Sequence, residues 1–372
     1  MKKGWTYKKF VDCINKIPKQ RQVKSKDYLS SGLYPIVSQE KELVSGYWND
    51  EDYLYKHDKP IIIFGDHTKE IKYIDFDFVV GADGTQILQP KDDIDSRFFY
   101  YALLATPIRS LGYARHFKLL KEKSFLIPKL TEQKRIVKQL DAAFAQIDEL
   151  KANAEKQLTE ARTLFQKALV KAMEPKEGWE EKKLGDVCKS VNYGTSLPST
   201  ENGKYKYLRM NNITIDGTLD LNNLKTIDVP EKELEKCVVR KGDLLFNRTN
   251  SPELVGKTCI FEEDEEMIIA GYIIRIRFND SIYPKFASYF INLQRKLGNL
   301  RALIVGAVHQ ANISAKAIQS INIQFPSFAE QQRIVERLDS ISENVRKYEE
   351  IQQKIIAECD ALKQALLRQV FE

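Results

Sequence analysis

Residues 127–141 read IPKLTEQKRIVKQLD, and residues 325–339 read FPSFAEQQRIVERLD. The two stretches lie 198 residues apart and agree at eight of fifteen positions. In each, a proline ends an extended run, and a glutamate follows in the first helical turn, where the helix dipole favours negative charge. Neither proline nor glycine occurs in 131–173 or in 329–371. The sequence therefore predicts the same long helix twice.

Apolar residues recur along both predicted helices at alternating steps of three and four. The first series begins Ile136, Leu140, Ala143, Ile147, Leu150, and the second begins Ile334, Leu338, Ile341, Val345. A period of 3.5 residues keeps one stripe facing a partner helix, so the pattern predicts a coiled coil. The alternative is a pair of amphipathic helices, each packed on its own domain.

The repetition extends beyond the helices. Gly4-Trp5 with Lys8-Lys9 returns as Gly178-Trp179 with Lys182-Lys183, and Arg97-Phe98 with Tyr101 returns as Lys285-Phe286 with Tyr289. A repeat of this kind indicates one duplicated unit. The expected order is a first domain at 1–127, a helix and linker at 128–177, a second domain at 178–325 and a second helix at 326–372.

The segments before each helix have the composition of mixed α+β domains. Short β-rich runs occur at 60–64, 71–80, 244–246 and 267–278, and they are separated by turn residues. Each segment also contains a predicted helix near its end, at 96–105 and at 284–297. The predicted fold is thus α+β, with two globular domains and two long helices.

Composition narrows the function classes. The 372 residues are 43% apolar, and 58 Lys and Arg against 52 Asp and Glu give a net charge of +6, which is compatible with a polyanionic partner. No apolar run reaches the roughly 18 residues that cross a bilayer. The five cysteines are scattered along the sequence, which indicates reduced thiols and argues against disulfides and against a zinc site. We expect a cytoplasmic protein without a metal centre.

Clusters of polar residues in the expected loops have side chains that can bind DNA. Arg can bond to guanine and Asn or Gln to adenine in the major groove, while Lys suits phosphates. For any single residue, a turn or a surface ion pair explains the same residue equally well. As a set, the candidate DNA-binding residues are His67, Lys69, Arg115, His116, Lys118, Arg209, Asn211, Asn212, Arg248, Asn250, His309, Gln310 and Asn312.

Three motifs imitate catalytic sites. The stretch 251–258 resembles the end of a phosphate loop, but Ser251 stands where that loop needs glycine, so we interpret it as a turn entering a strand. Asp66, Glu70 and Lys72 could imitate a metal-dependent nuclease, although a charged edge strand explains them as well. The Asn-Pro-Pro-Tyr type of loop found in base methyltransferases does not occur, since the chain contains no Pro-Pro. Catalytic residues are therefore not expected.

Taken together, these motifs resemble the specificity subunit of Type I restriction-modification systems. The resemblance rests on the Gly-Trp openings, on Gly242-Asp243-Leu-Leu-Phe246, and above all on the doubled Pro-x-x-x-Glu-Gln-x-x-Ile-Val helix start. The first half departs from the pattern, having Pro60-Ile61 where Gly-Asp is expected. The resemblance implies two target-recognition domains, each reading half of a split DNA site, separated by two antiparallel coiled-coil helices in a pseudo-two-fold repeat.

The resemblance also implies partners: double-stranded DNA, two methyltransferase subunits and, in the full complex, restriction subunits. No cofactor is expected in this chain, because S-adenosylmethionine, ATP and Mg²⁺ would be used by the other subunits. The residues expected to form the coiled coil or meet these partners are Glu132, Gln133, Ile136, Leu140, Ile147, Leu150, Glu330, Gln331, Ile334, Leu338, Ile341 and Val345. Two other functions stay open: a Mg²⁺-dependent nuclease using Asp66, Glu70 and Lys72, and a coiled-coil scaffold that binds protein.

Overall fold

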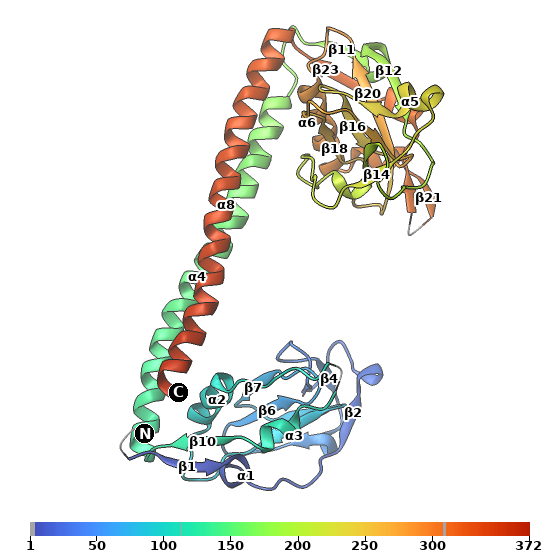
Figure 1. The fold of residues 1–372 in the computed structure, drawn as a ribbon. Helices are drawn as coiled ribbons and strands as arrows, with labels where there is room; N and C mark the ends of the chain where they lie inside the picture. Colours follow the sequence, from blue (N-terminus) through green and yellow to red (C-terminus); the bar gives the residue numbers. More distant parts are fainter. Residues whose placement is uncertain (1–3, 113, 308–309) are drawn as a thin grey trace. The chain divides into compact units, whose positions relative to one another are not determined.

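The computed structural model describes residues 4–112, 114–307 and 310–372 (Figure 1). The chain divides into two compact units, Met1–Gln157 with Gln352–Glu372, and Leu158–Ile351. Each unit therefore contains one mixed α/β globule and parts of two long helices, α4 (Leu130–Met173) and α8 (Phe328–Phe371). None of the described helices is long and apolar enough to cross a membrane.

The globule of the first unit contains a five-stranded sheet, a three-stranded sheet and a two-stranded ribbon. The five-stranded sheet has the order β2-β8-β3-β4 with β5 also on β8, the three-stranded sheet is β7-β6-β9, and the ribbon pairs β1 with β10. Its elements are β1 (Thr6–Lys9), α1 (Phe10–Cys13), β2 (Gln22–Lys24), β3 (Tyr34–Val37), β4 (Gly46–Trp48), β5 (Leu54–Tyr55), β6 (Ile61–Gly65), β7 (Ile71–Ile74), β8 (Phe78–Ala82), β9 (Thr85–Leu88), α2 (Ser96–Ala105), α3 (Phe117–Lys121) and β10 (Ser124–Ile127).

The globule of the second unit is built on two four-stranded sheets, β12-β20-β16-β18 and β14-β13-β19-β15. A three-stranded sheet β17-β22-β21 and a ribbon β11-β23 complete it. Its elements are β11 (Glu180–Lys183), β12 (Cys188–Tyr193), β13 (Tyr205–Leu208), β14 (Lys225–Ile227), α5 (Glu231–Cys237), β15 (Val238–Val239), β16 (Leu244–Asn247), β17 (Thr249–Asn250), β18 (Thr258–Ile260), β19 (Met267–Ile269), β20 (Ile273–Phe278), α6 (Pro284–Lys296), β21 (Val305–Ala307), β22 (Gln310–Asn312), α7 (Ala315–Gln319) and β23 (Asn322–Phe325).

Two of the expected β runs are each divided between two sheets. The run 71–80 forms β7, which pairs with β6, and β8, which pairs with β2, β3 and β5. The run 267–278 likewise forms β19 in one four-stranded sheet and β20 in the other. Both predicted β-rich runs contain strands, and within each run the chain crosses from one sheet to another, at 75–77 and at 270–272.

In each unit, α4 and α8 pair along part of their length. In the first unit Lys363 bonds to Asp148, and Lys151 bonds to Asp360 at 2.7 Å. From one ion pair to the next, the residue number increases along α4 and decreases along α8, so the two helices are antiparallel there. In the second unit Arg162 bonds to Glu349 at 2.7 Å. The N-terminal turns of both helices also pack on their own globules: Ile136 and Leu140 join the first core, and Ile334 and Leu338 the second.

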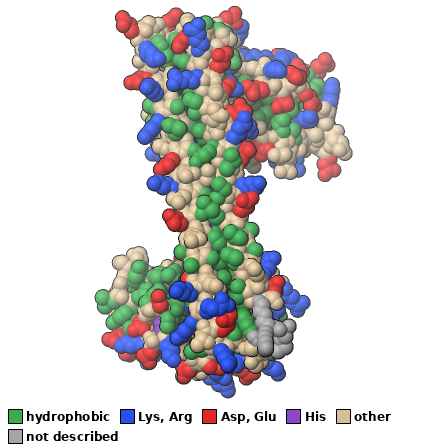
Figure 2. Space-filling model, turned by 90° about the vertical axis from the view of Figure 1, so that its left-hand side faces the viewer, with side chains coloured by type: hydrophobic (Ala, Val, Ile, Leu, Met, Phe, Trp, Pro, Cys, Tyr) green, Lys and Arg blue, Asp and Glu red, His purple; other side chains and the backbone are tan. Residues whose placement is uncertain are grey.

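Part of the predicted apolar stripe is not buried between the helices. Ile147 and Ala154 are buried in the first unit, but Leu150 is 53% exposed and Leu362 is 49% exposed. In the second unit Leu164 is 62% exposed, while Ile341 and Val345 are half-buried. Hydrophobic side chains are visible along the helices of each unit in Figure 2. The expectation that Leu150 lies in the seam is thus corrected: an antiparallel pair buries one narrow stripe, and Leu150 falls beside it.

Candidate DNA interface

Each globule is joined to its helix by a buried glutamine. Gln133 accepts a hydrogen bond from the backbone N–H of Asp95 at 2.7 Å and donates to the carbonyls of Asp93 and Pro128 at 3.0 and 2.9 Å. Gln331 makes the same three bonds in the second unit, to Tyr283 at 2.8 Å and to Ser281 and Pro326 at 2.8 and 2.9 Å.

These glutamines have no exposed surface. The expectation that Gln133 and Gln331 form the coiled coil or meet a partner subunit is therefore corrected, because each side-chain amide is hydrogen-bonded to the backbone of its own unit. Glu132 and Glu330, in contrast, lie at the surface, where they pair with Arg135 at 2.6 Å and with Arg333 at 3.4 Å.

A tyrosine–aspartate pair adds a second link at each joint. Tyr101 donates to Asp141, and Tyr289 donates to Asp339 at 2.6 Å. Burial, followed by the bond to Asp339, raises the pKa of Tyr289 well above its usual value, so the phenol stays protonated as a donor. Lys285 also reaches Asp339, at 2.9 Å. The two globules are therefore attached to their helices by corresponding polar contacts.

In the first unit, the turns that join β6 to β7 and β8 to β9 lie together. The backbone N–H of Asp66 donates to the carbonyl of Gly84 at 2.8 Å, and that of His67 donates to the Gln39 side chain at 3.0 Å. Arg115 lies across this edge, 4.0 Å from the carboxylates of both Asp66 and Asp83, with 69% of its side chain exposed. We call His67, Lys69 and Arg115 the first reading cluster.

The neighbouring His116 does not belong to this cluster. Its ring is fully buried, its Nε2 accepts from the Leu111 N–H at 2.9 Å, and its Nδ1 faces the Asp66 carbonyl at 3.0 Å. Because both ring nitrogens are bonded inside the globule, the expectation that His116 binds DNA is corrected. Lys118, on α3, is exposed.

The nuclease-like set does not assemble. The Asp66 carboxylate accepts from the Phe117 N–H at 2.7 Å, at the start of α3. The Lys72 ammonium group instead donates hydrogen bonds to the backbone carbonyls of Ser38 and Glu42, and burial lowers the pKa of Lys72. Among the described residues no group of three or more His, Cys, Asp or Glu could hold a metal ion. Asp66 and Lys72 thus have separate structural contacts.

In the second unit, two segments that are sixty residues apart in the sequence meet in one small sheet. β17 pairs with β22, which places Thr249 opposite Asn312 and Asn250 opposite Ala311. The Thr249 hydroxyl donates to Asn312 at 2.5 Å. Arg248, which precedes β17, lies with its guanidinium 4.9 Å from the centre of the Tyr193 ring and donates to the Gly271 carbonyl at 3.4 Å. We call Arg248, Asn250, Gln310 and Asn312 the second reading cluster.

Tyr193 and its loop were not found from the sequence. Gly194 follows it, and a Cβ there would lie 2.2 Å from the Ile269 carbonyl oxygen, so only glycine fits. Tyr272, whose carbonyl accepts from the Arg248 N–H, is 50% exposed at the same edge. The adjacent pairs Tyr193-Gly194 and Gly271-Tyr272 are the signal that could have pointed to this loop.

The loop after β13 joins the same edge. Asn247 donates to the Met210 carbonyl at 3.2 Å, which ties this loop to the end of β16. Arg209 donates to the Asn223 carbonyl at 3.1 Å, and Asn211 is exposed. Asn212 is buried and bonds to the backbone of Arg209 and Asp220, so its assignment to DNA is corrected to a structural turn. His309, the remaining candidate, lies outside the described residues.

Three buried polar atoms at this edge have no hydrogen-bond partner among the described residues: Nε of Arg209, Oδ1 of Asn247 and Nε of Arg248. An unpaired buried polar atom costs about 1–3 kcal/mol. Such atoms are usually satisfied by protein, water or a ligand.

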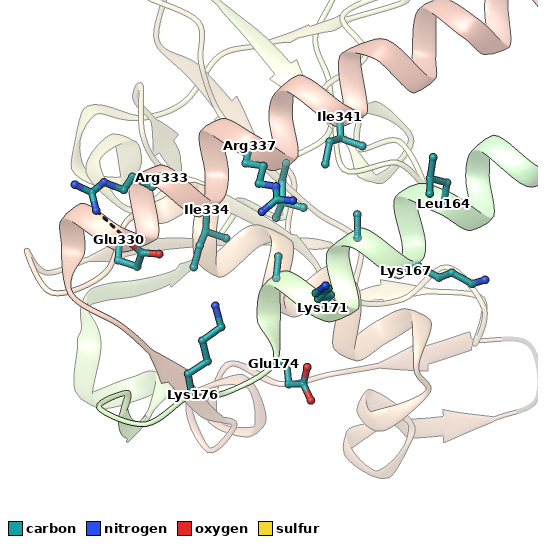
Figure 3. Close-up of a pocket in the computed structure, with 13 residues that line it drawn as sticks. Leu164, Lys167, Lys171, Glu174, Lys176, Glu330, Arg333, Ile334, Arg337 and Ile341 are labelled. Carbon is teal, nitrogen blue, oxygen red and sulfur yellow. Dashed lines mark hydrogen bonds and ion pairs between the residues drawn. The ribbon is translucent and has the colours of Figure 1, made fainter.

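A groove runs between α4 and α8 in the second unit (Figure 3). It has a volume of about 570 Å³, with Leu164, Ile334 and Ile341 among its apolar lining residues. Charged side chains surround it, of which Glu330 pairs with Arg333. The cations that line it are Lys167, Lys171, Lys176, Arg333 and Arg337. The groove thus offers an apolar surface with a mostly positive border.

A model of the Type I restriction modification DNA specificity domain matches residues 2–160 and, separately, residues 176–357. The chain belongs to this family. Specificity subunits recognise DNA sequence and have no catalytic role, which removes the nuclease alternative. The polar clusters of the two globules are therefore candidate DNA-reading surfaces.

Known relatives agree with this assignment. The chain is 26% identical over 373 residues to the Type I restriction enzyme EcoR124I/EcoR124II specificity subunit of Escherichia coli, covering 91% of this chain and 88% of that one. It is 26% identical over 311 residues to the EcoKI specificity subunit of Escherichia coli K12, covering 77% of this chain and 67% of the relative.

Two of the matching solved structures show the same fold with a TM-score above 0.5. One is described as the structural basis underlying complex assembly and conformational transition of the type I R-M system. The match covers 98% of this chain and 97% of the chain in that structure, with a TM-score of 0.72 and 20% sequence identity. The HsdS subunit from Thermoanaerobacter tengcongensis matches 99% of this chain and 97% of its own, with a TM-score of 0.53 at 20% identity.

Proposed function

We propose that this specificity subunit reads a bipartite DNA target, with one half-site bound by the segment 1–127 and the other by 178–325. The observation that carries this proposal is the meeting of Arg248, Asn250, Gln310 and Asn312 at one small sheet, beside three polar atoms without partners among the described residues. The separate family match to each half supports two readers in one chain, arranged as a pseudo-two-fold repeat.

The paired helices are proposed to form an antiparallel coiled coil that docks two methyltransferase subunits. In the second unit the groove lined by Leu164, Ile334 and Ile341 offers the apolar surface that a partner helix would cover. In the first unit the exposed Leu150 and Leu362 are available in the same way. Restriction subunits would join for cleavage, and S-adenosylmethionine, ATP and Mg²⁺ would bind to those partners. We expect the assembly to act in the cytoplasm, on the DNA held there.

The test is co-expression with a Type I methyltransferase partner, followed by sequencing of methylated adenines. We expect methylation of a split target in the combination, and no methyl transfer from S-adenosylmethionine by the purified chain alone. A split target whose two halves respond to separate segments supports the proposal. Transfer by the chain alone, or methylation with no sequence preference, would contradict it.

Arg248 gives a residue-level prediction. Its guanidinium is held over the Tyr193 ring, so little side-chain freedom is lost when it meets a base. Arg248→Ala is expected to relax discrimination at one position of the second half-site by about 1–3 kcal/mol, with the first half-site unchanged. Methylation frequencies across variant sites measure this. Arg240→Ala is the matched control, since Arg240 pairs with Glu235 and Glu266 and lies between β15 and β16, at the opposite end of β16 from Arg248.

A further inference from the structure

A group of three cations lies beside the second reading cluster. Arg295 and Lys296 end α6, and Arg301 lies in the short 3₁₀ helix Asn299–Leu303 that follows. With the turn at 252–255 they line a cavity of about 210 Å³. None of the three was singled out from the sequence as a DNA-binding residue.

The walls of this cavity are continuous with the reading sheet. The turn at 252–255 begins two residues after β17, and Ile304, the last lining residue, directly precedes β21. β17 and β21 are the two outer strands of the sheet that carries Asn250 and Gln310. The cavity therefore flanks the surface on which base contacts are proposed.

Positive charge dominates this cavity. Within the described chain, none of the three cations lies within 4.0 Å of a carboxylate. Glu253, the one acid that lines the cavity, has its pKa lowered by hydrogen bonds, first from the backbone and then from Ser251, and also by the charge of Arg301. Arg295 donates to the Glu253 and Ile215 carbonyls at 3.4 and 3.1 Å, and its Nε has no partner among the described residues. The C-terminal dipole of α6 accounts for Arg295 and Lys296 but not for Arg301.

A short repeat relates Arg301 to the first globule. Leu297-Gly298 precedes Arg301 with the same spacing as Leu111-Gly112 precedes Arg115. Both glycines adopt positive φ, 81° and 68°, a conformation that disfavours other residues. Arg115 lies at the first reading cluster with most of its side chain exposed. In both globules an arginine thus follows a Leu-Gly pair at the same spacing.

We propose that Lys296 and Arg301 bind backbone phosphates of the DNA flanking the second half-site, with Arg295 holding the turn beside them. This inference rests on the proposed DNA-reading function. Phosphate contacts fix the position of a protein on the duplex without reading sequence, and lysine and arginine supply them. Lys296 and Arg301, which have no carboxylate of the described residues within 4.0 Å and lie next to the second reading cluster, have this chemistry.

The experiment measures binding of the full-length chain to a fluorescent 30-base-pair duplex of random sequence, from low to moderate salt. Each phosphate contact contributes about 0.9 to the slope of log K against log salt concentration. The double variant Lys296→Gln/Arg301→Gln is expected to lower that slope by about 1.8. Both side chains are exposed, and circular dichroism checks that the variant is folded.

The matched control is Lys189→Gln/Lys241→Gln. Exposed Lys189 lies near the start of β12 and exposed Lys241 precedes β16, at the opposite end of the sheet from Tyr193 and Arg248. They pair with the exposed Asp280 and Asp264, and the control variant removes the same charge. An unchanged control slope with a lowered slope in the double variant supports the inference. The phosphate site is refuted, and the proposed function is not, if the unaltered chain binds with a steep salt dependence and the two variants have the same slope as each other, whether unchanged or lowered. If the unaltered chain shows no salt-dependent binding, the proposed function fails instead.

Discussion

Exchanging residues 178–325 for the corresponding segment of another family member is expected to change one half of the methylated target completely and to leave the other half as it was. All residues of the second reading cluster lie inside this segment, between Arg248 and Asn312. The segment also carries most of its own core, in which Phe246, Ile274 and Phe286 are fully buried. Contacts made by separate cores should contribute independently.

The joint should tolerate such an exchange. Gln331 lies outside the segment, and it holds the segment through the backbone N–H of Tyr283 and the backbone carbonyl of Ser281, which any sequence supplies. Methylome sequencing of cells carrying the chimera together with the methyltransferase measures the result. The reciprocal exchange of 1–127 is the control and should alter the other half. A chimera that changes both halves, or neither, would show that the two segments do not read separately.

The second large effect concerns the glutamine at the joint. Gln331→Leu is expected to destabilise the junction of α6 and α8 by roughly 3 kcal/mol or more, because three buried backbone groups lose their partners at about 1–3 kcal/mol each. Leucine is close to glutamine in size, so little of the loss comes from a cavity. Hydrogen–deuterium exchange of the peptide that contains Tyr283 should accelerate about a hundredfold.

The neighbouring residue provides the comparison. Gln332 is exposed on the same helical turn, so Gln332→Leu makes the same chemical change without touching the joint. Peptides from the first unit serve as an internal reference and should exchange at an unchanged rate. Equal protection at Tyr283 in both variants would mean that the buried glutamine contributes nothing to attachment. Gln133→Leu should reproduce the effect at the start of α2.

The helices could be predicted closely from the sequence. The expected helix at 96–105 matches α2 at both ends, and those at 131–173 and 329–371 differ from α4 and α8 by one residue at the start. Prolines before each long helix and the absence of helix breakers inside explain this success. The strands were harder, since the small sheet made by β17, β22 and β21 consists of two- and three-residue strands that carry no alternating pattern.

The candidate site could be predicted in parts only. Loops containing Arg248 and Gln310 were identified, but their meeting depends on pairing across sixty residues, which no local pattern reports. His116 and Asn212 have the residue types of DNA contacts, yet burial uses their polar atoms inside the fold. The same holds for Gln133, whose position in a repeated motif marked it as important without saying that its role is internal.

The two-stranded ribbons have a consequence for how such chains change over time. β1 pairs with β10 and β11 with β23, so the first and last strands of each globule are adjacent, and the last strand leads into α4 or α8. Insertions and deletions between the two strands alter the length of the chain without moving its point of attachment. Recombination that exchanges everything between such strands yields a new reader in one event. The long helices can stay unchanged while the globules diverge. This agrees with the two helix starts, which match at eight of fifteen positions, and with the two globules, which share only short motifs.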